Sequence, residues 1–258
     1  MKRILFLADT HCGHRSGLTP PDYQYSMSGD PIRRAWAKLQ RDGWKAYMGL
    51  REEIGSPDIV VGVGDLIEGD GDKNNGTELI TTDRLEQARM ASQALKVWDA
   101  KTYIIVRGTP SHAGQCEDFE DVIAARLNGQ IRDRAYIKVE GIVFDVCHHL
   151  SVIKDLKTRA TPLSREKIEN LLRWERAEAP KADIFIRAHT HMYCNVGGHN
   201  WEAFSLPALQ METKYGVKRA RNICDWGLLF FDIDQRRYTW QKRICQVKTQ
   251  TEPMIVIS

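Results

Sequence analysis

Three apolar runs of strand length in this chain are closely followed by carboxylate or imidazole side chains. Residues 4–8 lead to Asp9 and His11, residues 59–63 to Asp65, and residues 184–186 to His189 and His191. Because strand ends can meet at one edge of a sheet, we expect these side chains to lie together. Carboxylate and imidazole groups gathered in this way are ligands for a divalent metal ion. The pattern therefore predicts a metal site at the ends of several strands.

Two further segments have the same arrangement. The apolar run 103–106 leads to Arg107-Gly108-Thr109-Pro110-Ser111-His112, and the run 142–147 ends at His148. Taken in order from Asp9 to His191, the five segments resemble the motifs of the calcineurin-like metallophosphoesterases. The resemblance implies an α/β fold, a four-layer α-β-β-α sandwich of two mixed sheets flanked by helices.

The resemblance also implies roles for individual residues around two divalent metal ions. Asp65 matches the carboxylate that bridges the ions. The ligands of one ion match Asp9, His11 and His191, and those of the other match His148 and His189. A dinuclear site of this kind hydrolyses phosphoesters with a metal-activated hydroxide. Mixed nitrogen and oxygen ligands suit manganese, our first choice, or iron, zinc or nickel, better than calcium.

The third segment departs from the family pattern, which has an Asn ligand directly followed by a catalytic His. Counted from Gly108, the Asn position falls on Thr109, and counted from His112 it falls on Ser111. We therefore expect the second ion to be the more weakly bound. His112 is the candidate general acid, since an imidazolium can protonate a leaving oxygen near neutral pH. His149 is a candidate for phosphate binding or for orienting a metal ligand.

Several other residues near these motifs carry weaker expectations. Cys12 adjoins His11 and is a minor candidate for a metal ligand. Glu68, Arg107 and Asp155 could line the site, although no motif supports them. We expect His14 and His199 to be surface or loop residues. No substrate-binding residue is identified.

Composition limits the function classes only loosely. The 258 residues are 42% hydrophobic and 28% charged, which is ordinary for a globular protein. The net charge of +3 gives no global signal for nucleic acid. The six cysteines show no Cys-x-x-Cys spacing, which favours reduced thiols and a cytoplasmic location. The sequence contains no apolar stretch of the roughly 18 residues needed to span a membrane.

Periodicity and turn residues predict the elements along the chain. Helices are expected over 33–54, 81–99, 117–128 and 164–177, and a hairpin of strands 135–139 and 142–147 turns at Glu140-Gly141. Runs near 201–206, 226–233 and 237–247 are expected to form a meander of strands. We expect a single domain over 1–258, with loop insertions near 12–31 and 68–77.

A local charge bias bears on the substrate. Between residues 213 and 248, nine Lys or Arg residues stand against three Asp residues. A basic surface attracts nucleic acid, so DNA or RNA is a candidate partner and a phosphodiesterase or nuclease the first expectation. The alternatives are a phosphomonoesterase acting on small molecules or phosphoprotein, and a non-catalytic scaffold with the same fold. The oligomeric state is left open.

Overall fold

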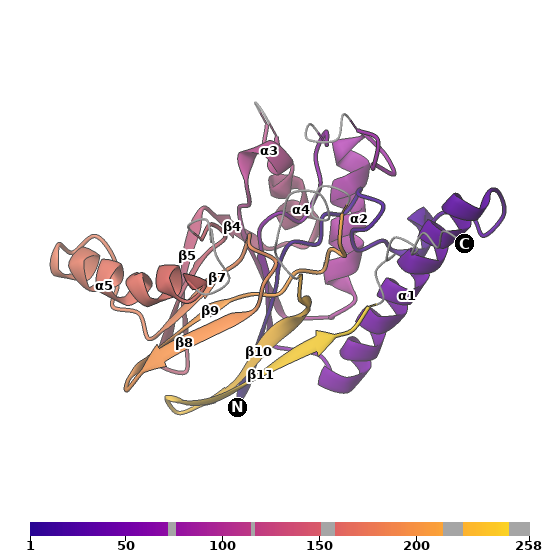
Figure 1. Cartoon of the computed structure of the whole chain (residues 1–258). Coiled ribbons are helices and arrows are strands. Elements are labelled where there is room, and N and C mark those ends of the chain that lie inside the picture. The colour runs from indigo at the N-terminus through magenta and orange to yellow at the C-terminus, as the bar shows by residue number, and fades with distance from the viewer. Residues whose placement is uncertain (72–75, 115–116, 151–157, 214–223, 248–258) are drawn as a thin grey trace, which may run out of the picture.

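Two β-sheets face each other in the computed structural model, which describes residues 1–71, 76–114, 117–150, 158–213 and 224–247 (Figure 1). The six-stranded sheet has the order β11 (Arg237–Cys245), β10 (Trp226–Asp234), β1 (Lys2–Leu7), β2 (Ile59–Val63), β3 (Thr102–Val106) and β4 (Gln130–Arg132). The five-stranded sheet has the order β5 (Arg134–Val139), β6 (Ile142–Cys147), β7 (Ile184–Arg187), β9 (Trp201–Ser205) and β8 (Cys194–Gly198). Both sheets contain parallel and antiparallel pairs, so both are mixed.

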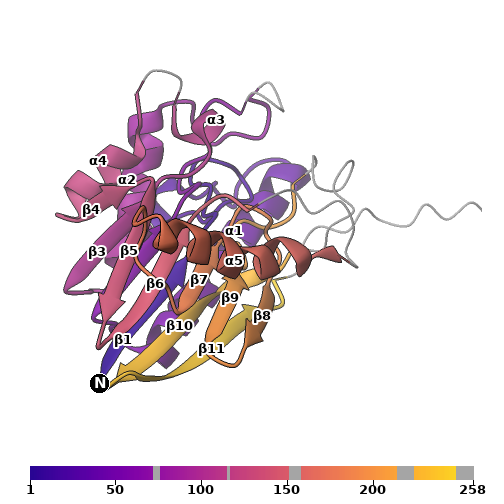
Figure 2. The same cartoon turned by 90° about the vertical axis from the view of Figure 1, so that its left-hand side faces the viewer.

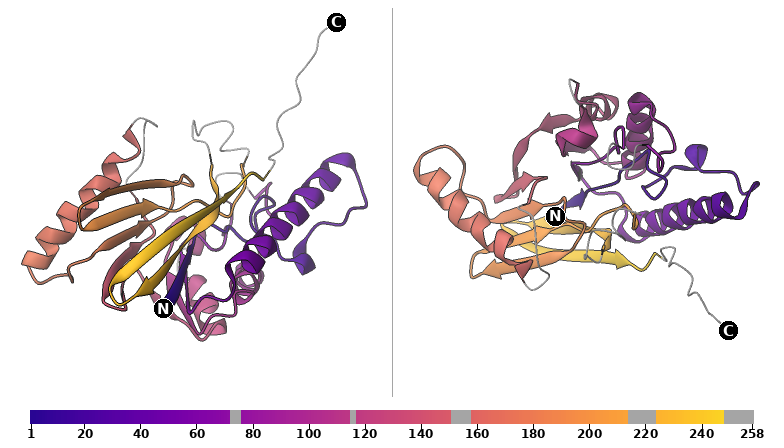
Figure 3. Two further views of the ribbon diagram at one scale, coloured as in Figure 1. Left: turned by 90° about the horizontal axis from the view of Figure 1, so that it is seen from below. Right: turned by 45° about the horizontal axis from the view of Figure 1, so that its top comes forward.

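Helices cover the outer faces of the two sheets (Figure 3). The six-stranded sheet carries α1 (Pro31–Ile54), α2 (Arg84–Lys96) and α4 (Glu120–Arg126), whose apolar residues share one core cluster with it. The five-stranded sheet is covered by α5 (Thr161–Glu175). Two short helices, η1 (Pro21–Tyr23) and α3 (Pro110–Ala113), lie in loops. The four-layer α-β-β-α sandwich expected from the sequence is therefore confirmed.

The side chains of β1 from Ile4 to Leu7 are apolar on both faces of the strand because both faces are buried. Ile4 and Phe6 point into the core between the sheets, where the Phe6 ring lies 5.4 Å from that of Phe144. Leu5 and Leu7 point the other way, into the core beneath the helices. Alternate side chains of a strand face opposite sides, so a strand buried on both sides must be apolar throughout.

Most of the expected elements are present, with small shifts at their ends. Helix α2 begins at Arg84 rather than at residue 81, because the carboxylate of Asp83 accepts hydrogen bonds from the backbone N–H groups of Leu85 and Glu86. The hairpin of β5 and β6 turns at Glu140 and Gly141, both with positive φ.

The expected meander near the C-terminus is wrong. β10 and β11 form an antiparallel hairpin in the six-stranded sheet, but β9 belongs to the other sheet and pairs with β7 and β8 (Figure 2). Periodicity identifies a strand but does not identify its partner, because both sheets offer an apolar inner face. In the described part of the chain, no helix is both long enough and apolar enough to cross a membrane.

Candidate metal centre

The residues that the motifs single out gather at one end of the two sheets. Asp9 and His11 follow β1, Asp65 follows β2, Thr109 and His112 follow β3, His148 follows β6, and His189 and His191 follow β7. In three-dimensional space their donor atoms form groups within 4.8 Å of one another: Asp9, His11 and His191; Asp65, His148 and His189; and His11, Glu68 and His112. Segments up to 182 residues apart in the sequence therefore meet at one site.

The backbone at this site is strained. Five of the candidate residues have positive φ although none is glycine: Asp9 (50°), His11 (42°), Asp65 (50°), His189 (73°) and His191 (56°). Side chains with a Cβ rarely adopt this conformation, and such strain concentrates at functional sites. Hydrogen bonds between the loops hold it in place, among them Asp9 N–H to the Gly64 carbonyl at 3.0 Å and His11 N–H to the Asp65 carbonyl at 3.0 Å.

The first group consists of Asp9, His11 and His191. Asp9 Oδ1 lies 3.9 Å from His11 Nε2 and 3.3 Å from His191 Nε2. Asp9 Oδ1 and His11 Nε2 are both buried without a hydrogen-bond partner in the described part of the chain. Leaving buried polar atoms unpaired costs free energy, and a cation between them would satisfy both. The three side chains therefore fit a divalent metal ion.

The second group consists of Asp65, His148, His189 and a hydroxyl. Asp65 Oδ2 lies 3.1 Å from His148 Nε2 and 3.9 Å from His189 Nδ1. The Thr109 hydroxyl lies among them, 3.1 Å from Asp65 Oδ2, 3.3 Å from His189 Nδ1 and 3.5 Å from His148 Nε2. Ser111, by contrast, is exposed on α3. Of the two alternatives for the missing Asn, only Thr109 is thus brought to this group.

Hydrogen bonds orient two of the histidines. His148 Nδ1 donates to the Val63 carbonyl at 2.7 Å, so its Nε2 faces Asp65. His11 Nδ1 donates to the Glu68 carboxylate at 2.7 Å, so its Nε2 faces Asp9. Metal-binding histidines typically use one ring nitrogen in this way and keep the other for the ion.

His112 lies beside the second group on α3. Its Nδ1 donates to the backbone carbonyl of Glu68 at 2.8 Å, and its Nε2 lies 4.0 Å from Asp65 Oδ2. The ring also packs edge-on against His11, with 4.8 Å between centroids. The bond at Nδ1 leaves Nε2 free to exchange a proton within the site.

The charges of the site attract protons in the absence of metal. Burial lowers the pKa of His148, but the Asp65 carboxylate opposes this and raises it to about 10. Burial likewise lowers the pKa of His191, and the Asp9 carboxylate raises it to about 10. Burial raises the pKa of Glu68, but the hydrogen bond from His11 brings it down to about 2. The buried carboxylates of Asp65 and Asp9 therefore favour positive charge at this site.

Asp65 influences both groups. Burial lowers the pKa of His11, and the charge of Asp65 opposes this shift. Burial raises the pKa of Asp9, but His191 brings it below its ordinary value, and the charge of Asp65 opposes that fall. The carboxylate therefore lies close to the first group as well. This position is compatible with the bridging role that the resemblance implies.

Three residues that were weaker candidates for the site are not found at the two metal groups in the described part of the chain. The Cys12 thiol points into the core and donates to the Leu18 carbonyl at 3.1 Å, away from the metal groups. Arg107 forms surface ion pairs with Asp118, Asp121 and Asp133 rather than lining the site. Asp155 lies outside the described residues.

Three other histidines lie outside the two metal groups. His14 is a loop residue but is buried, with its Nδ1 accepting from the Ser16 backbone N–H at 3.1 Å, so it is not a surface residue. His199 is an exposed turn residue. His149 is exposed and packs on His189 with 4.9 Å between ring centroids.

Sequence patterns missed two residues at the site. Glu120 of α4 lies fully buried behind the loops that carry Asp65 and Thr109. Cys224, just before β10, lies close enough to His191 to add to its raised pKa, after the larger effects of burial and of Asp9. Neither stands at a strand end that follows the motif order, so only the tertiary structure reveals them.

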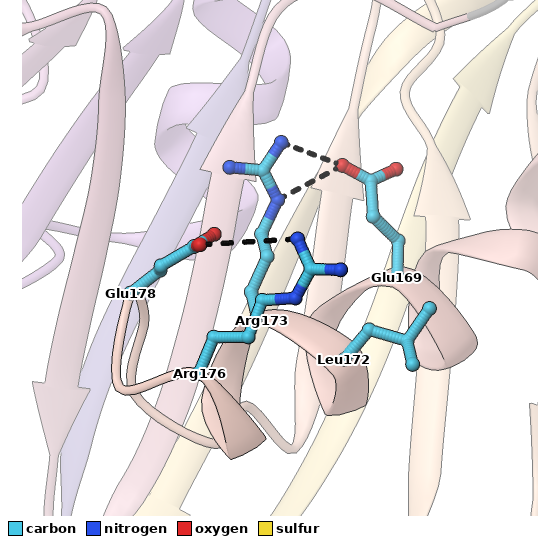
Figure 4. A pocket seen from close by; sticks show the side chains of 5 residues that line it. All are labelled: Glu169, Leu172, Arg173, Arg176 and Glu178. Atoms are coloured by element: carbon cyan, nitrogen blue, oxygen red, sulfur yellow. Dashed lines mark hydrogen bonds and ion pairs between the residues drawn. The ribbon is translucent and has the colours of Figure 1, made fainter.

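A surface pocket of about 260 Å³ lies elsewhere, along α5 (Figure 4). Its lining is Glu169, Leu172, Arg173, Arg176 and Glu178, and includes none of the candidate site residues. Its charges are already paired, Arg173 with Glu169 at 3.0 Å and Arg176 with Glu178 at 4.0 Å.

Solved structures share this architecture. Vps29 of Chaetomium thermophilum matches with a TM-score of 0.50 at 8% identity, covering 95% of each chain. A novel archaeal phosphodiesterase matches at 0.48 and 12% identity, covering 93% of this chain and 99% of that one. Zinc-bound Vps29 of Entamoeba histolytica matches with a TM-score of 0.46 at 11% identity, covering 94% of this chain and 98% of that one.

Comparison of the sequence itself with known proteins adds nothing: no family model and no curated protein matches it. At these identities the structural likeness concerns the fold alone. The chain has the metallophosphoesterase fold, as the motif order implied.

Proposed function

We propose that this protein is a metal-dependent phosphoesterase, most simply a phosphodiesterase or nuclease, formed by a single domain over residues 1–258. The observation that carries the proposal is the pair of buried Asp and His groups, with Asp9 Oδ1 and His11 Nε2 lacking any other described partner. Asp9, His11 and His191 would hold one divalent ion. Asp65, His148, His189 and Thr109 would hold the other. Manganese is the first expectation for both, with iron, zinc or nickel as alternatives.

The bound ions would neutralise phosphate oxygens and lower the pKa of a water molecule. The residues of the chain supply the remaining functions. Glu68 and Val63 orient His11 and His148 by accepting hydrogen bonds from their Nδ1–H groups. His112, held through Nδ1 by the Glu68 carbonyl, presents Nε2 to the site and would donate a proton to the leaving oxygen.

A metal-by-substrate screen tests the proposal. Metal-stripped protein is supplied with manganese, nickel, zinc or magnesium and given bis-p-nitrophenyl phosphate, p-nitrophenyl phosphate, and single- and double-stranded DNA and RNA. We expect metal-dependent hydrolysis of the diester and of a nucleic acid. Hydrolysis of the monoester alone would point to a phosphomonoesterase.

The variant Asp65→Asn accompanies the screen, with Asp42→Asn on the exposed face of α1 as the matched control. Because Asp65 lies close to both groups, we expect Asp65→Asn to abolish turnover and to lower the bound metal measured by elemental analysis. Asp42→Asn should behave as the wild type. Near-normal turnover with two bound metals in Asp65→Asn would contradict the assignment.

A non-catalytic scaffold is the second candidate, because Thr109 replaces the amide ligand that the resemblance implies. A hydroxyl is a weaker neutral ligand than an amide oxygen, so the second ion could be lost and turnover with it. Wild-type protein that binds metal but hydrolyses none of the substrates would favour this alternative. The cytoplasmic location and the nucleic-acid partner remain predictions.

A further inference from the structure

Helix α4 places one acidic side chain directly behind the candidate metal centre. Glu120 is fully buried, with an exposed fraction of 0%. Its Oε1 accepts a hydrogen bond from the Leu66 backbone N–H at 3.0 Å, and its Oε2 accepts one from the Gly108 backbone N–H at 2.7 Å. Leu66 directly follows Asp65, and Gly108 directly precedes Thr109. A single carboxylate therefore spans the two loops that carry these ligands.

The two loops approach each other as closely as their backbones allow. The Thr109 N–H donates to Asp65 Oδ1 at 2.6 Å, and the Thr109 hydroxyl donates to Asp65 Oδ2 at 3.1 Å. A Cβ on Gly108 would lie 2.1 Å from the Asp65 nitrogen, so only glycine fits there. Small displacements of either loop would separate the Thr109 hydroxyl from the second metal group.

Burying an ionised carboxylate at this position is energetically unfavourable. Neither hydrogen-bond partner of Glu120 carries a charge, and burial raises the pKa of this carboxyl to about 7 although both N–H bonds favour the ionised form. A carboxylate offers two acceptor oxygens in a fixed fork, which two converging N–H groups require. A glutamine at this position could accept only one of the two bonds and would direct its own N–H₂ at the other N–H.

We propose that Glu120 is a positioning residue for the second metal group. Its carboxylate holds the Leu66 and Gly108 peptide groups at a fixed separation, so that Asp65 and Thr109 present their oxygens to one ion together with His148 and His189. The inference rests on the proposed function in one respect, that this group binds a divalent metal. It concerns metal affinity, and turnover is affected only through that affinity.

Titration of the full-length protein with Mn²⁺ tests the role. Calorimetry of metal-stripped wild type should resolve two binding events of different strength. In Glu120→Gln the Mn²⁺ affinity of the weaker site should fall about 10- to 100-fold, which is the usual effect of disturbing groups that orient metal ligands. Activity on bis-p-nitrophenyl phosphate should fall at limiting Mn²⁺ and recover toward the wild-type kcat when Mn²⁺ is saturating.

Asn170→Ala is the matched control. Asn170 of α5 is also fully buried and also clamps backbone, accepting from the Ala182 N–H at 2.9 Å and donating to the Pro180 carbonyl at 3.0 Å. Its loss should lower the unfolding temperature without changing either Mn²⁺ affinity. Glu120→Asp keeps the charge but is one methylene too short to span both N–H groups, and it replaces Glu120→Gln if that variant does not fold.

The outcomes separate the positioning role from the proposed function. An active wild type whose Mn²⁺ affinities are unchanged in the Glu120 variant would overturn only the positioning role. A wild type that binds two Mn²⁺ ions but hydrolyses no phosphoester would overturn only the enzymatic function, and the affinity readout would still decide the role of Glu120. A wild type that binds neither Mn²⁺ nor any of iron, nickel, zinc and magnesium would overturn both.

Discussion

At the scale of single residues, this site depends on which atom of each side chain is left free. Three imidazoles, His11, His112 and His148, each use Nδ1 to donate to a fixed oxygen and keep Nε2 for the interior of the site. The oxygens that accept these bonds come from Glu68 and Val63. Tautomer and orientation are therefore set by neighbours rather than by the histidines themselves.

Replacing His112 by alanine should slow turnover about 100-fold or more while both metals remain bound, because a general acid contributes on this scale. The defect should shrink with p-nitrophenolate as leaving group, which needs no proton. Steady-state rates on substrates with good and poor leaving groups, together with metal analysis, check this. An equal loss on both kinds of substrate would instead assign His112 to metal or substrate binding.

Replacing Thr109 tests whether its hydroxyl is the proposed neutral ligand of the second ion. Thr109→Val keeps the shape of the side chain but removes the hydroxyl. It should lower the affinity for the second Mn²⁺ ion about 10-fold. Thr109→Asn supplies an amide oxygen and should raise the affinity for the second Mn²⁺ ion. Ser111→Ala, two residues further along the chain and exposed on α3, is the control and should leave the titration unchanged. A weakened titration in Ser111→Ala with an unchanged one in Thr109→Val would reverse the assignment.

At the scale of elements, β11 is an edge strand with basic side chains on both faces. Lys242 lies over the Tyr193 ring, with Nζ 4.2 Å from the centroid, whereas Arg243 faces α1 and pairs with Glu53 at 2.6 Å. Adjacent residues on a strand point to opposite sides, so one phosphate backbone cannot meet both. Five of the nine basic residues in the C-terminal segment lie outside the described residues: Lys214, Lys218, Arg219, Arg221 and Lys248.

If β11 guides nucleic acid, Lys242→Ala should reduce the log–log salt slope of DNA or RNA binding by about 0.7–0.9. Arg243→Ala should change the slope less, because Glu53 already compensates its charge. Binding titrations over a range of salt concentrations measure both slopes. Unchanged affinity at low salt in Lys242→Ala, with activity on small phosphoesters intact, would favour a small-molecule substrate.

At the scale of the whole molecule, the candidate site should make stability depend on pH and on added metal. The folded-state pKa values of His148 and His191 are raised to about 10 from an ordinary 6.5. Their contribution to stability is therefore fully present below about pH 6.5 and is lost as the pH rises toward 10. The unfolding temperature of metal-stripped protein should fall between pH 6.5 and pH 8.5.

Added Mn²⁺ should flatten that pH dependence and raise the unfolding temperature at pH 8.5, because the ion replaces the protons as the positive charge. Thermal unfolding monitored by circular dichroism, with and without Mn²⁺, checks both effects. Metal-stripped protein that is more stable at pH 8.5 than at pH 6.5 would contradict the charge assignment.

Much of this molecule could be predicted from local sequence. The apolar runs before Asp9, Asp65, His148, His189 and His191 identify strands buried on both faces, and the polar residues at their ends form the candidate site. The four layers follow from the resemblance that the motif order carries. The hairpin at Glu140 and Gly141 and the approximate extents of the helices follow from turn residues and periodicity. These features depend on the side chains of each segment and on motif order.

Other features depend on contacts between distant segments, which no local pattern encodes. The sequence left Thr109 and Ser111 as alternatives, and only the approach of the loop after β3 to Asp65 brings the Thr109 hydroxyl to the second group. The sheet to which β9 belongs was decided in the same way. The burial of Glu120 against two backbone N–H groups likewise required the packed structure. Strand pairing and the burial of polar groups are settled by long-range packing, so tertiary structure alone determines them.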